Sequence, residues 1–229
     1  MKQPHRILEY PTVINEKSDN KGILKRADDK FFLESHSYLL GIKIGFGILA
    51  IAFGIWLFTA STKNQEFILP VLLILGGLFW VVYGLYAKKK HKIFELNRLV
   101  GTVTYPDSYF RPPLKGKFKD IHAVIAVTGN IDGYVDREYL KFVNTFKPRK
   151  MSLLYSFDGS EPYRDWSFYV WYMDKNRPLP PGTAFDAYRQ QDFERRKAEG
   201  FPKPLYESNI PTPEATEEQQ AERERIGGW

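Results

Sequence analysis

The side chains that could do chemistry are sparse in this chain of 229 residues, and their spacing assembles no catalytic site. Gly129 and Gly133 frame a glycine loop, but the Lys-Ser or Lys-Thr pair of a phosphate-binding loop does not follow them. The chain has four histidines: His5, His36, His91 and His122. None stands at ligand spacing from another histidine or from a carboxylate, so we expect no metal site. The absence of Cys excludes a thiolate metal site, a Cys nucleophile and a disulfide scaffold.

Two polar clusters complete the search for catalytic groups. The segment 156–160 (SFDGS) lacks the flanking glycines of a nucleophile elbow and is typical of a turn. Asp132, Asp136 and Glu138 form an acidic cluster that is more simply explained as the solvated start of a strand. Without a positioned nucleophile, base or metal set, we expect the protein not to be an enzyme and to need no cofactor.

Aromatic and arginine side chains, the types that dominate protein-binding hot spots, gather in the last third of the chain. The segment 166–173 (WSFYVWYM) is predicted as a strand with apolar side chains on both faces. Such a strand is either central and covered by a helix at 184–199, or part of a partner surface. On the second interpretation, the partner-binding residues are Trp166, Tyr169, Trp171, Arg177, Tyr188 and Arg189. The proline-rich stretch 178–181 would stiffen the loop of that surface.

Two long apolar blocks must position this candidate surface relative to a membrane. They span 38–60 and 67–86, and the six polar residues 61–66 separate them. At about 1.5 Å per residue, a helix over either block would cross a hydrocarbon core of about 30 Å. The sequence therefore predicts a transmembrane helical hairpin over 38–87.

Basic residues predict the orientation of this hairpin. The net charge of +6 arises largely from Lys and Arg in the polar flanks of the two blocks. By the positive-inside rule, both termini are then cytoplasmic and the loop 61–66 is external. Four lysines directly after the second block would meet anionic lipid headgroups: Lys88, Lys89, Lys90 and Lys92. We expect these basic residues to contact the lipid bilayer and not a nucleic acid.

Two features within the apolar blocks have alternative interpretations. Lys43 would be costly in hydrocarbon, so we expect it to snorkel to the headgroups, with ion or proton conduction as the alternative. Small residues recur at helical spacing in three pairs: Gly41 and Gly45, Gly47 and Gly54, Gly77 and Gly84. These glycines allow close packing within the hairpin, or homo-oligomerisation through another helix face.

Alternating apolar residues after the lysines predict a cytoplasmic α+β domain over 88–200. The predicted strands cover 91–96, 101–105, 121–128, 139–146, 151–157 and 166–173. They suggest an antiparallel sheet, a roll or a sandwich, followed by one helix at 183–200 that Thr183 begins and Gly200 ends. This order resembles a pleckstrin-like architecture. Residues 1–37 form an N-terminal segment that could drape on this domain, and 201–229 a Pro- and Glu-rich tail with at most a short helix at 214–226.

Two sequence elements resemble a bacterial membrane-protein family with two N-terminal transmembrane helices. The first comprises Phe94, Asn97, Arg98, Gly101 and Val103. The second is the run 171–182 (WYMDKNRPLPPG), followed by Tyr188, Arg189 and Asp192. Together the elements extend the resemblance over roughly residues 35–195. Some members are similar to proteins encoded beside type VI secretion effectors, where they look like immunity proteins.

The resemblance implies a multi-pass protein of the bacterial inner membrane that acts by protein binding. Its expected function is immunity, in which it neutralises a cognate secreted toxin. The alternative is a membrane-tethered adaptor or lipid-binding module built on a pleckstrin-like domain. The cytoplasmic sheet and the lysines at 88–92 would then contact anionic headgroups.

Overall fold

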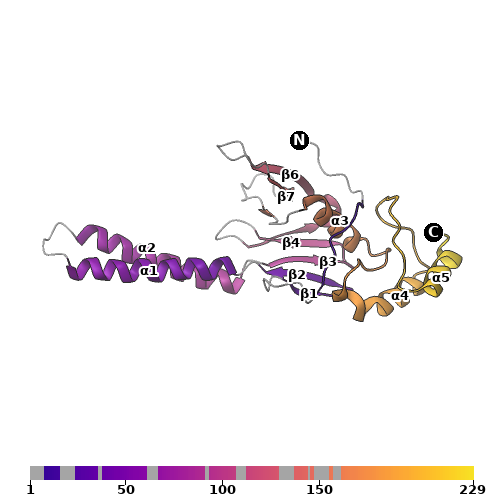
Figure 1. Ribbon diagram of the computed structural model, residues 1–229, viewed down its shortest axis with the longest axis horizontal. Coiled ribbons are helices and arrows are strands. Elements are labelled where there is room, and N and C mark those ends of the chain that lie inside the picture. The colour runs from indigo at the N-terminus through magenta and orange to yellow at the C-terminus, as the bar shows by residue number, and fades with distance from the viewer. Residues whose placement is uncertain are drawn as a thin grey trace.

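The computed structural model describes residues 8–15, 24–35, 38–60, 67–90, 93–106, 112–128, 137–143, 145–146, 155–156 and 161–229. The molecule is elongated: two long helices project from one end of a polar domain, and the C-terminus lies at the other end (Figure 1). We call α1 and α2 the helix pair, and the remaining described residues the polar domain.

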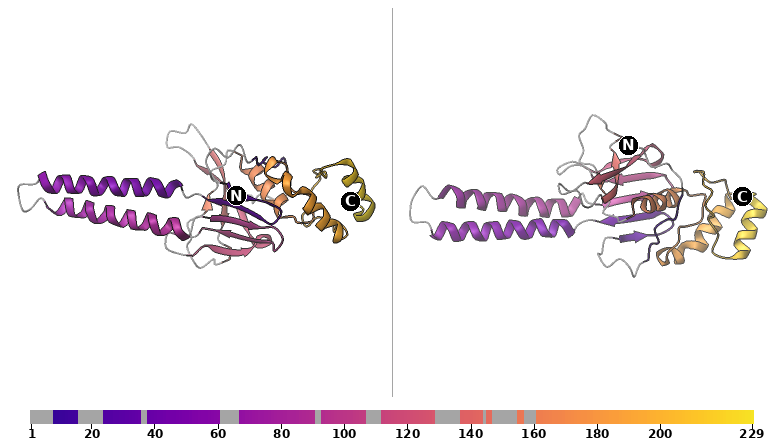
Figure 2. Two further views of the ribbon diagram at one scale, coloured as in Figure 1. Left: turned by 90° about the horizontal axis from the view of Figure 1, so that it is seen from below. Right: turned by 45° about the horizontal axis from the view of Figure 1, so that its top comes forward.

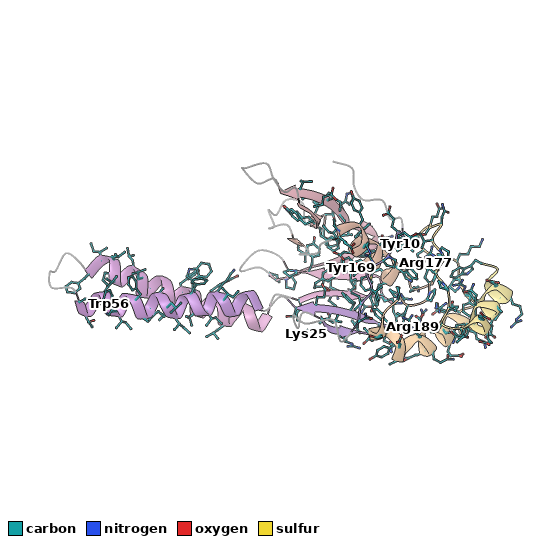
Figure 3. All side chains as sticks on the ribbon, viewed as in Figure 1. Tyr10, Lys25, Trp56, Tyr169, Arg177 and Arg189 are labelled. Carbon is teal, nitrogen blue, oxygen red and sulfur yellow. The ribbon has the colours of Figure 1, made fainter. Side chains whose placement is uncertain are left out.

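The helix pair consists of α1 (Tyr38–Ala60) and α2 (Ile68–Lys90), which lie side by side and antiparallel (Figures 1 and 2). Large apolar side chains point outward from both helices; Phe46 is 67% exposed and Ile68 is 71% exposed. Trp56 projects from the side of α1 (Figure 3). The two expected apolar helices are confirmed, and both are long and apolar enough to span a membrane.

Glycines bring the two helices into close contact. A Cβ atom added to Gly77 would lie 2.6 Å from the carbonyl oxygen of Gly47, and one added to Gly54 would lie 2.9 Å from that of Pro70. These three glycines therefore serve the packing within the pair, the first of the two alternatives. By contrast, Gly41 and Gly45 have no neighbouring atom within 4 Å of an added Cβ.

The main sheet of the polar domain has five antiparallel strands in the order β1-β2-β3-β4-β5. Its strands are β1 (Leu24–Ala27), β2 (Phe31–Ser35), β3 (Ile93–Asn97), β4 (Thr102–Tyr105) and β5 (Leu114–Lys117). The strands before and after the helix pair are neighbours, with Phe31 opposite Asn97 and Ser35 opposite Ile93. An antiparallel helix pair starts and ends at one end, so it returns the chain beside β2.

A second antiparallel sheet contains β6 (His122–Thr128), β7 (Arg137–Val143) and β8 (Tyr155–Ser156), in that order. A single turn of 3₁₀-helix, η3 (Phe118–Asp120), connects it to β5. The predicted strand at 121–128 is confirmed by β6, and the one at 139–146 is confirmed as far as Val143, where β7 ends. Of the predicted strand at 151–157, residues 155–156 form β8, and the rest lie outside the described residues.

The predicted strand at 166–173 is wrong: these residues belong to the helix α3 (Pro162–Met173). Every residue from Trp166 to Met173 is buried. The sequence therefore lacks the regularly spaced polar residues that reveal the period of an amphipathic helix, and the apolar run also fits a strand. The signals for the helix lie just before the run. Pro162 occupies the first helical turn and Asp165 is an acidic residue near the N-terminus of the helix.

The chain after α3 divides the helix predicted at 183–200 into two elements and adds the short helix expected in the tail. It forms a 3₁₀-helix, η4 (Thr183–Tyr188), then α4 (Arg189–Ala198) and α5 (Glu217–Gly227). Thr183 therefore does not begin an α-helix, whereas Gly200, with a φ of 78°, follows the end of α4 as expected. Residues 201–229 pack on the domain, since Phe201 is 1% exposed, and the expected short helix is α5.

The core lies between the sheets and α3, and it is rich in aromatic rings. The ring centroids of Phe94 and Tyr169 are 5.2 Å apart, and those of Phe142 and Trp166 are 5.8 Å apart. Residues 8–15 lie along α3: the Thr12 hydroxyl donates to the Asp165 carboxylate at 2.8 Å. Residues 8–15 are thus draped on the domain, whereas 24–27 and 31–35 of the same segment are strands of the main sheet, which were not predicted from the sequence.

Candidate functional site

A buried network of charged side chains joins the main sheet to the segments after α3. We call it the arginine network and define it by its members: Arg98, Arg177, Arg195, Arg196, Arg223, Asp174, Asp192 and Glu214. Its described ion pairs and hydrogen bonds connect α3, α4, α5 and the turn between β3 and β4. It contains the largest group of buried charges in the described residues and is therefore the candidate site.

Arg98 lies at the centre of the network and is fully buried. Its guanidinium donates to the carbonyl oxygens of Tyr172 at 2.5 Å and Arg177 at 2.6 Å. It also lies 3.4 Å from Oδ1 of Asp192. The turn that carries Arg98 is fixed locally, because Gly101 adopts a φ of 72° and the amide oxygen of Asn97 accepts from the Val100 N–H.

Three arginine side chains surround the carboxylate of Asp192, which lies on α4. Besides Arg98, it accepts hydrogen bonds from Arg195 and Arg196, each at 2.8 Å. Arg196 then donates through two nitrogens to the two oxygens of Glu214, both at 2.7 Å. This bidentate contact is the strong form of a charge-assisted hydrogen bond. It ties the segment before α5 to α4.

Asp174 and Arg177 hold the chain just beyond α3. The Asp174 carboxylate accepts from the backbone N–H of Leu205 at 2.9 Å and from Arg177 at 3.2 Å. Arg177 also donates to the Thr212 hydroxyl and to the carbonyl oxygen of Tyr206. The bonds to Leu205, Thr212 and Tyr206 fix the 201–212 segment against the end of α3.

The charges of the network shift each other's pKa values. Burial alone would raise the pKa of Asp192, but Arg98, Arg196 and Arg195 outweigh it and hold that pKa below its ordinary value. Burial lowers the pKa of Arg98, with Asp192 acting in the opposite direction. For Arg196, the contacts with Glu214 and Asp192 outweigh burial and raise its pKa. Within the network, the charges of Arg98, Asp192 and Arg196 therefore offset one another's cost of burial.

Four of the six residues expected to bind a partner are buried inside the chain. Trp166 and Arg177 are 3% and 4% exposed, and Tyr169 and Trp171 are each 5% exposed. Figure 3 shows Tyr169 and Arg177 within the polar domain. Trp166, Tyr169 and Trp171 lie on α3 and are buried in the core, and Arg177 is buried in the network, so none of the four forms an exposed surface. This burial favours the first of the two interpretations, in which the segment is central and covered, although it is a helix and not a strand.

The other two expected residues, Tyr188 and Arg189, are half-buried at the start of α4. Arg189 donates to the carbonyl oxygens of Leu179, Pro180 and Gly182 at 2.9 to 3.2 Å. It therefore fixes the proline-rich stretch 178–181, of which residues 178–180 are buried. The expected recognition loop is packed in the structure, with Arg189 as its anchor.

The lysines expected at the membrane surface follow the helix pair. Lys88, Lys89 and Lys90 belong to the last turn of α2, and Lys92 lies outside the described residues. Within the pair, the Lys43 ammonium lies 5.6 Å from the ring centroids of both Trp80 and Tyr83. The Lys43 ammonium thus makes cation–π contacts with two aromatic rings of α2.

Groups that could hold a metal ion are absent from the described residues: no three His, Asp or Glu side chains come together there. The sequence elements that carry the family resemblance do come together. Arg98 of the first element contacts Tyr172 and Asp192 of the second. Their role is to hold the fold, and the pairing of Arg98 with Asp192 is what sequence reasoning missed.

Comparisons of the chain with models of known protein families, with curated proteins and with solved structures find no match.

Proposed function

We propose that the protein is anchored in a membrane by the helix pair and that its polar domain acts by binding another protein. The observation that carries this proposal is the contrast between the two parts of the elongated molecule (Figure 1). The helix pair exposes large apolar side chains along its length, whereas the polar domain has an aromatic core in which most of its large apolar side chains are buried. A lipid bilayer is the environment that removes such exposed apolar helices from water.

The proposed orientation has both termini in the cytoplasm of a bacterium and the helix pair in its inner membrane. The excess of Lys and Arg outside the helix pair supports this orientation, since 61–66 contains one Lys and one Glu. Lys43 supports anchoring and not conduction, because its charge meets Trp80 and Tyr83 and the apolar stretches contain no Asp, Glu or His.

Fusions of reporter enzymes test this orientation. A reporter that is active in the cytoplasm should be active when fused after residue 229, and a reporter that is active outside should be active when inserted at 61–66. High activity of an external reporter fused after residue 229 would contradict the proposal.

Protein binding is supported by what the described residues contain and lack. They hold no metal-binding cluster, and the described ion pairs of the arginine network join segments of the polar domain to one another. The candidate partner that the family resemblance suggests is a secreted toxin encoded nearby. Expression of the protein should protect cells from that toxin, and deletion should sensitise them to a neighbouring attacker. Equal survival with and without the protein would refute the immunity function and leave protein binding open.

Lipid binding is the second candidate, and the position of Lys88, Lys89 and Lys90 at the end of α2 favours it. Basic residues near an anionic surface contribute about 1 kcal/mol each. The test is reconstitution of the full chain into bilayers with and without anionic lipid. Replacement of the three lysines by Gln should reduce selective retention of anionic lipid, with Lys25→Gln on the outer strand β1 as the control.

A further inference from the structure

The edges of the main sheet are protected against pairing with another chain. Proteins commonly guard exposed sheet edges with short strands, charged side chains or bulges. At one edge, β1 is four residues long, carries Lys25 and Arg26, and has a register shift between Leu24 and Arg26. At the other edge, β5 is also four residues long and carries Lys115 and Lys117. Figure 3 shows Lys25 beside the outer strands of this sheet.

The outer strand β6 of the second sheet has none of these protections. It runs for seven residues, His122–Thr128 (HAVIAVT), without a charged side chain, a Pro or a Gly. Its pairing with β7 continues without a shift from His122 opposite Val143 to Thr128 opposite Arg137. Among the described residues, the backbone of 123–128 pairs with β7 and with no other segment. This edge is a regular, uncharged template for a further strand.

The side chains of β6 show which face a further strand would extend. Ala123 and Ile125 point into the core and are 4% and 7% exposed. Val127 follows on the same side of the strand but is 47% exposed. An added strand with apolar residues at alternate positions would cover Val127 and continue the core beyond β6.

We propose that the outer edge of β6 binds an extended segment of another protein, which joins the second sheet as an additional strand. The proposal rests on the proposed function, since it names the surface through which the polar domain binds protein. Backbone hydrogen bonds along the edge would supply affinity, and alternate side chains would supply specificity. The strand β7 shows the pattern that fits, because Leu140 and Phe142 face the core and alternate with Lys141.

A second copy of this chain does not fit this edge when both copies span one bilayer. A twofold axis along the bilayer normal relates two copies of β6 as antiparallel strands only if β6 is perpendicular to that axis. β6 instead runs obliquely along the length of the molecule, whose long axis is the direction of α1 and α2 (Figures 1 and 2). The occupant is therefore a segment of a different protein.

The test measures hydrogen exchange of the full chain in lipid nanodiscs, with and without a peptide that copies residues 137–143 (REYLKFV) as the probe. The peptide should slow exchange in 123–128 at concentrations up to about 1 mM, where weak strand addition becomes measurable. Val127→Lys should abolish this protection, because it places a charge on the bare edge. Val127→Thr keeps a β-branched, uncharged residue and should retain it.

Val100→Lys is the matched control, since Val100 is 69% exposed and belongs to the turn between β3 and β4, not to β6. It should keep the protection, and all variants should unfold at the midpoint of the wild-type protein. Unchanged exchange in 123–128, or equal protection in Val127→Lys, would overturn the proposal. Self-association that Val127→Lys abolishes would also overturn it, in favour of a second copy. Failure here leaves membrane anchoring intact, because the topology assays do not depend on β6.

Discussion

Replacement of Arg98 by Ala removes the centre of the arginine network. The fully buried guanidinium donates to the carbonyl oxygens of Tyr172 and Arg177 and pairs with Asp192. Breaking a buried ion pair costs about 3–5 kcal/mol, and a buried acceptor without a donor costs about 1–3 kcal/mol. These losses overlap, and Asp192 keeps Arg195 and Arg196. We therefore expect the free energy of unfolding to fall by about 4 kcal/mol.

The assay is denaturant unfolding of the full chain in detergent micelles, followed by tryptophan fluorescence. Trp166 and Trp171 are buried in the core of the polar domain, so their emission reports on loss of that core. Arg98→Lys should recover part of the loss, because an ammonium keeps the charge but not the planar fork of donors. Arg225→Ala is the control, since that side chain is 72% exposed, and it should change stability by no more than about 0.5 kcal/mol. A loss below about 1 kcal/mol for Arg98→Ala would refute the structural role of the network.

Three further predictions follow from the described contacts. The pKa of Asp192 is held low in the folded state, so its pairing stabilises the fold above the unfolded pKa of about 4 and is lost as the pH falls below that value. Acid unfolding should therefore be less steep in Asp192→Asn, and an unchanged profile would contradict this. Gly182→Ala should lower the free energy of unfolding by more than about 1 kcal/mol, because Gly182 has a φ of 131° and a Cβ there would lie 2.0 Å from the Ile14 carbonyl oxygen. Thermal unfolding measures this loss. A neutral effect would show that residues 8–15 do not pack against Gly182. Gly77→Ala should separate α1 from α2, whereas Gly41→Ala should not, because only the Cβ at position 77 would contact the backbone of the other helix. Disulfide crosslinking between Cys pairs introduced into α1 and α2 should therefore fall in Gly77→Ala alone.

The strand predictions show where alternation is a reliable signal. β3, β4, β6 and β7 each have one face toward the core, so buried and exposed residues alternate along them. The segment 166–173 gave the opposite result, because an element buried on all sides has no polar residues to mark its period. β1 and β2 were missed because they are short and flank the charged turn at 28–30, and their partner strand β3 lies beyond the helix pair.

The arginine network could not be predicted from local sequence. Arg98 and Asp192 are 94 residues apart, and only the folded sheet and α4 bring them together. The family resemblance included both residues without indicating that they touch. Arg177 and Arg189 were expected on a surface because arginine is common at binding sites, but in the folded chain both bond to backbone carbonyls. The arginine residue type suggested a role in recognition, but the contacts of these two side chains show a role in holding the fold.

Cysteine labelling tests membrane anchoring most directly, since the natural chain has no Cys and each introduced thiol reports alone. Asn64→Cys lies between α1 and α2, and Glu207→Cys lies on the exposed surface of the polar domain. A maleimide that does not cross the inner membrane should label Asn64→Cys in spheroplasts, and should label Glu207→Cys only after the membrane is permeabilised. Labelling of Glu207→Cys in sealed spheroplasts, or release of the protein from membranes by alkaline carbonate, would contradict the proposal that the helix pair holds the polar domain in the cytoplasm.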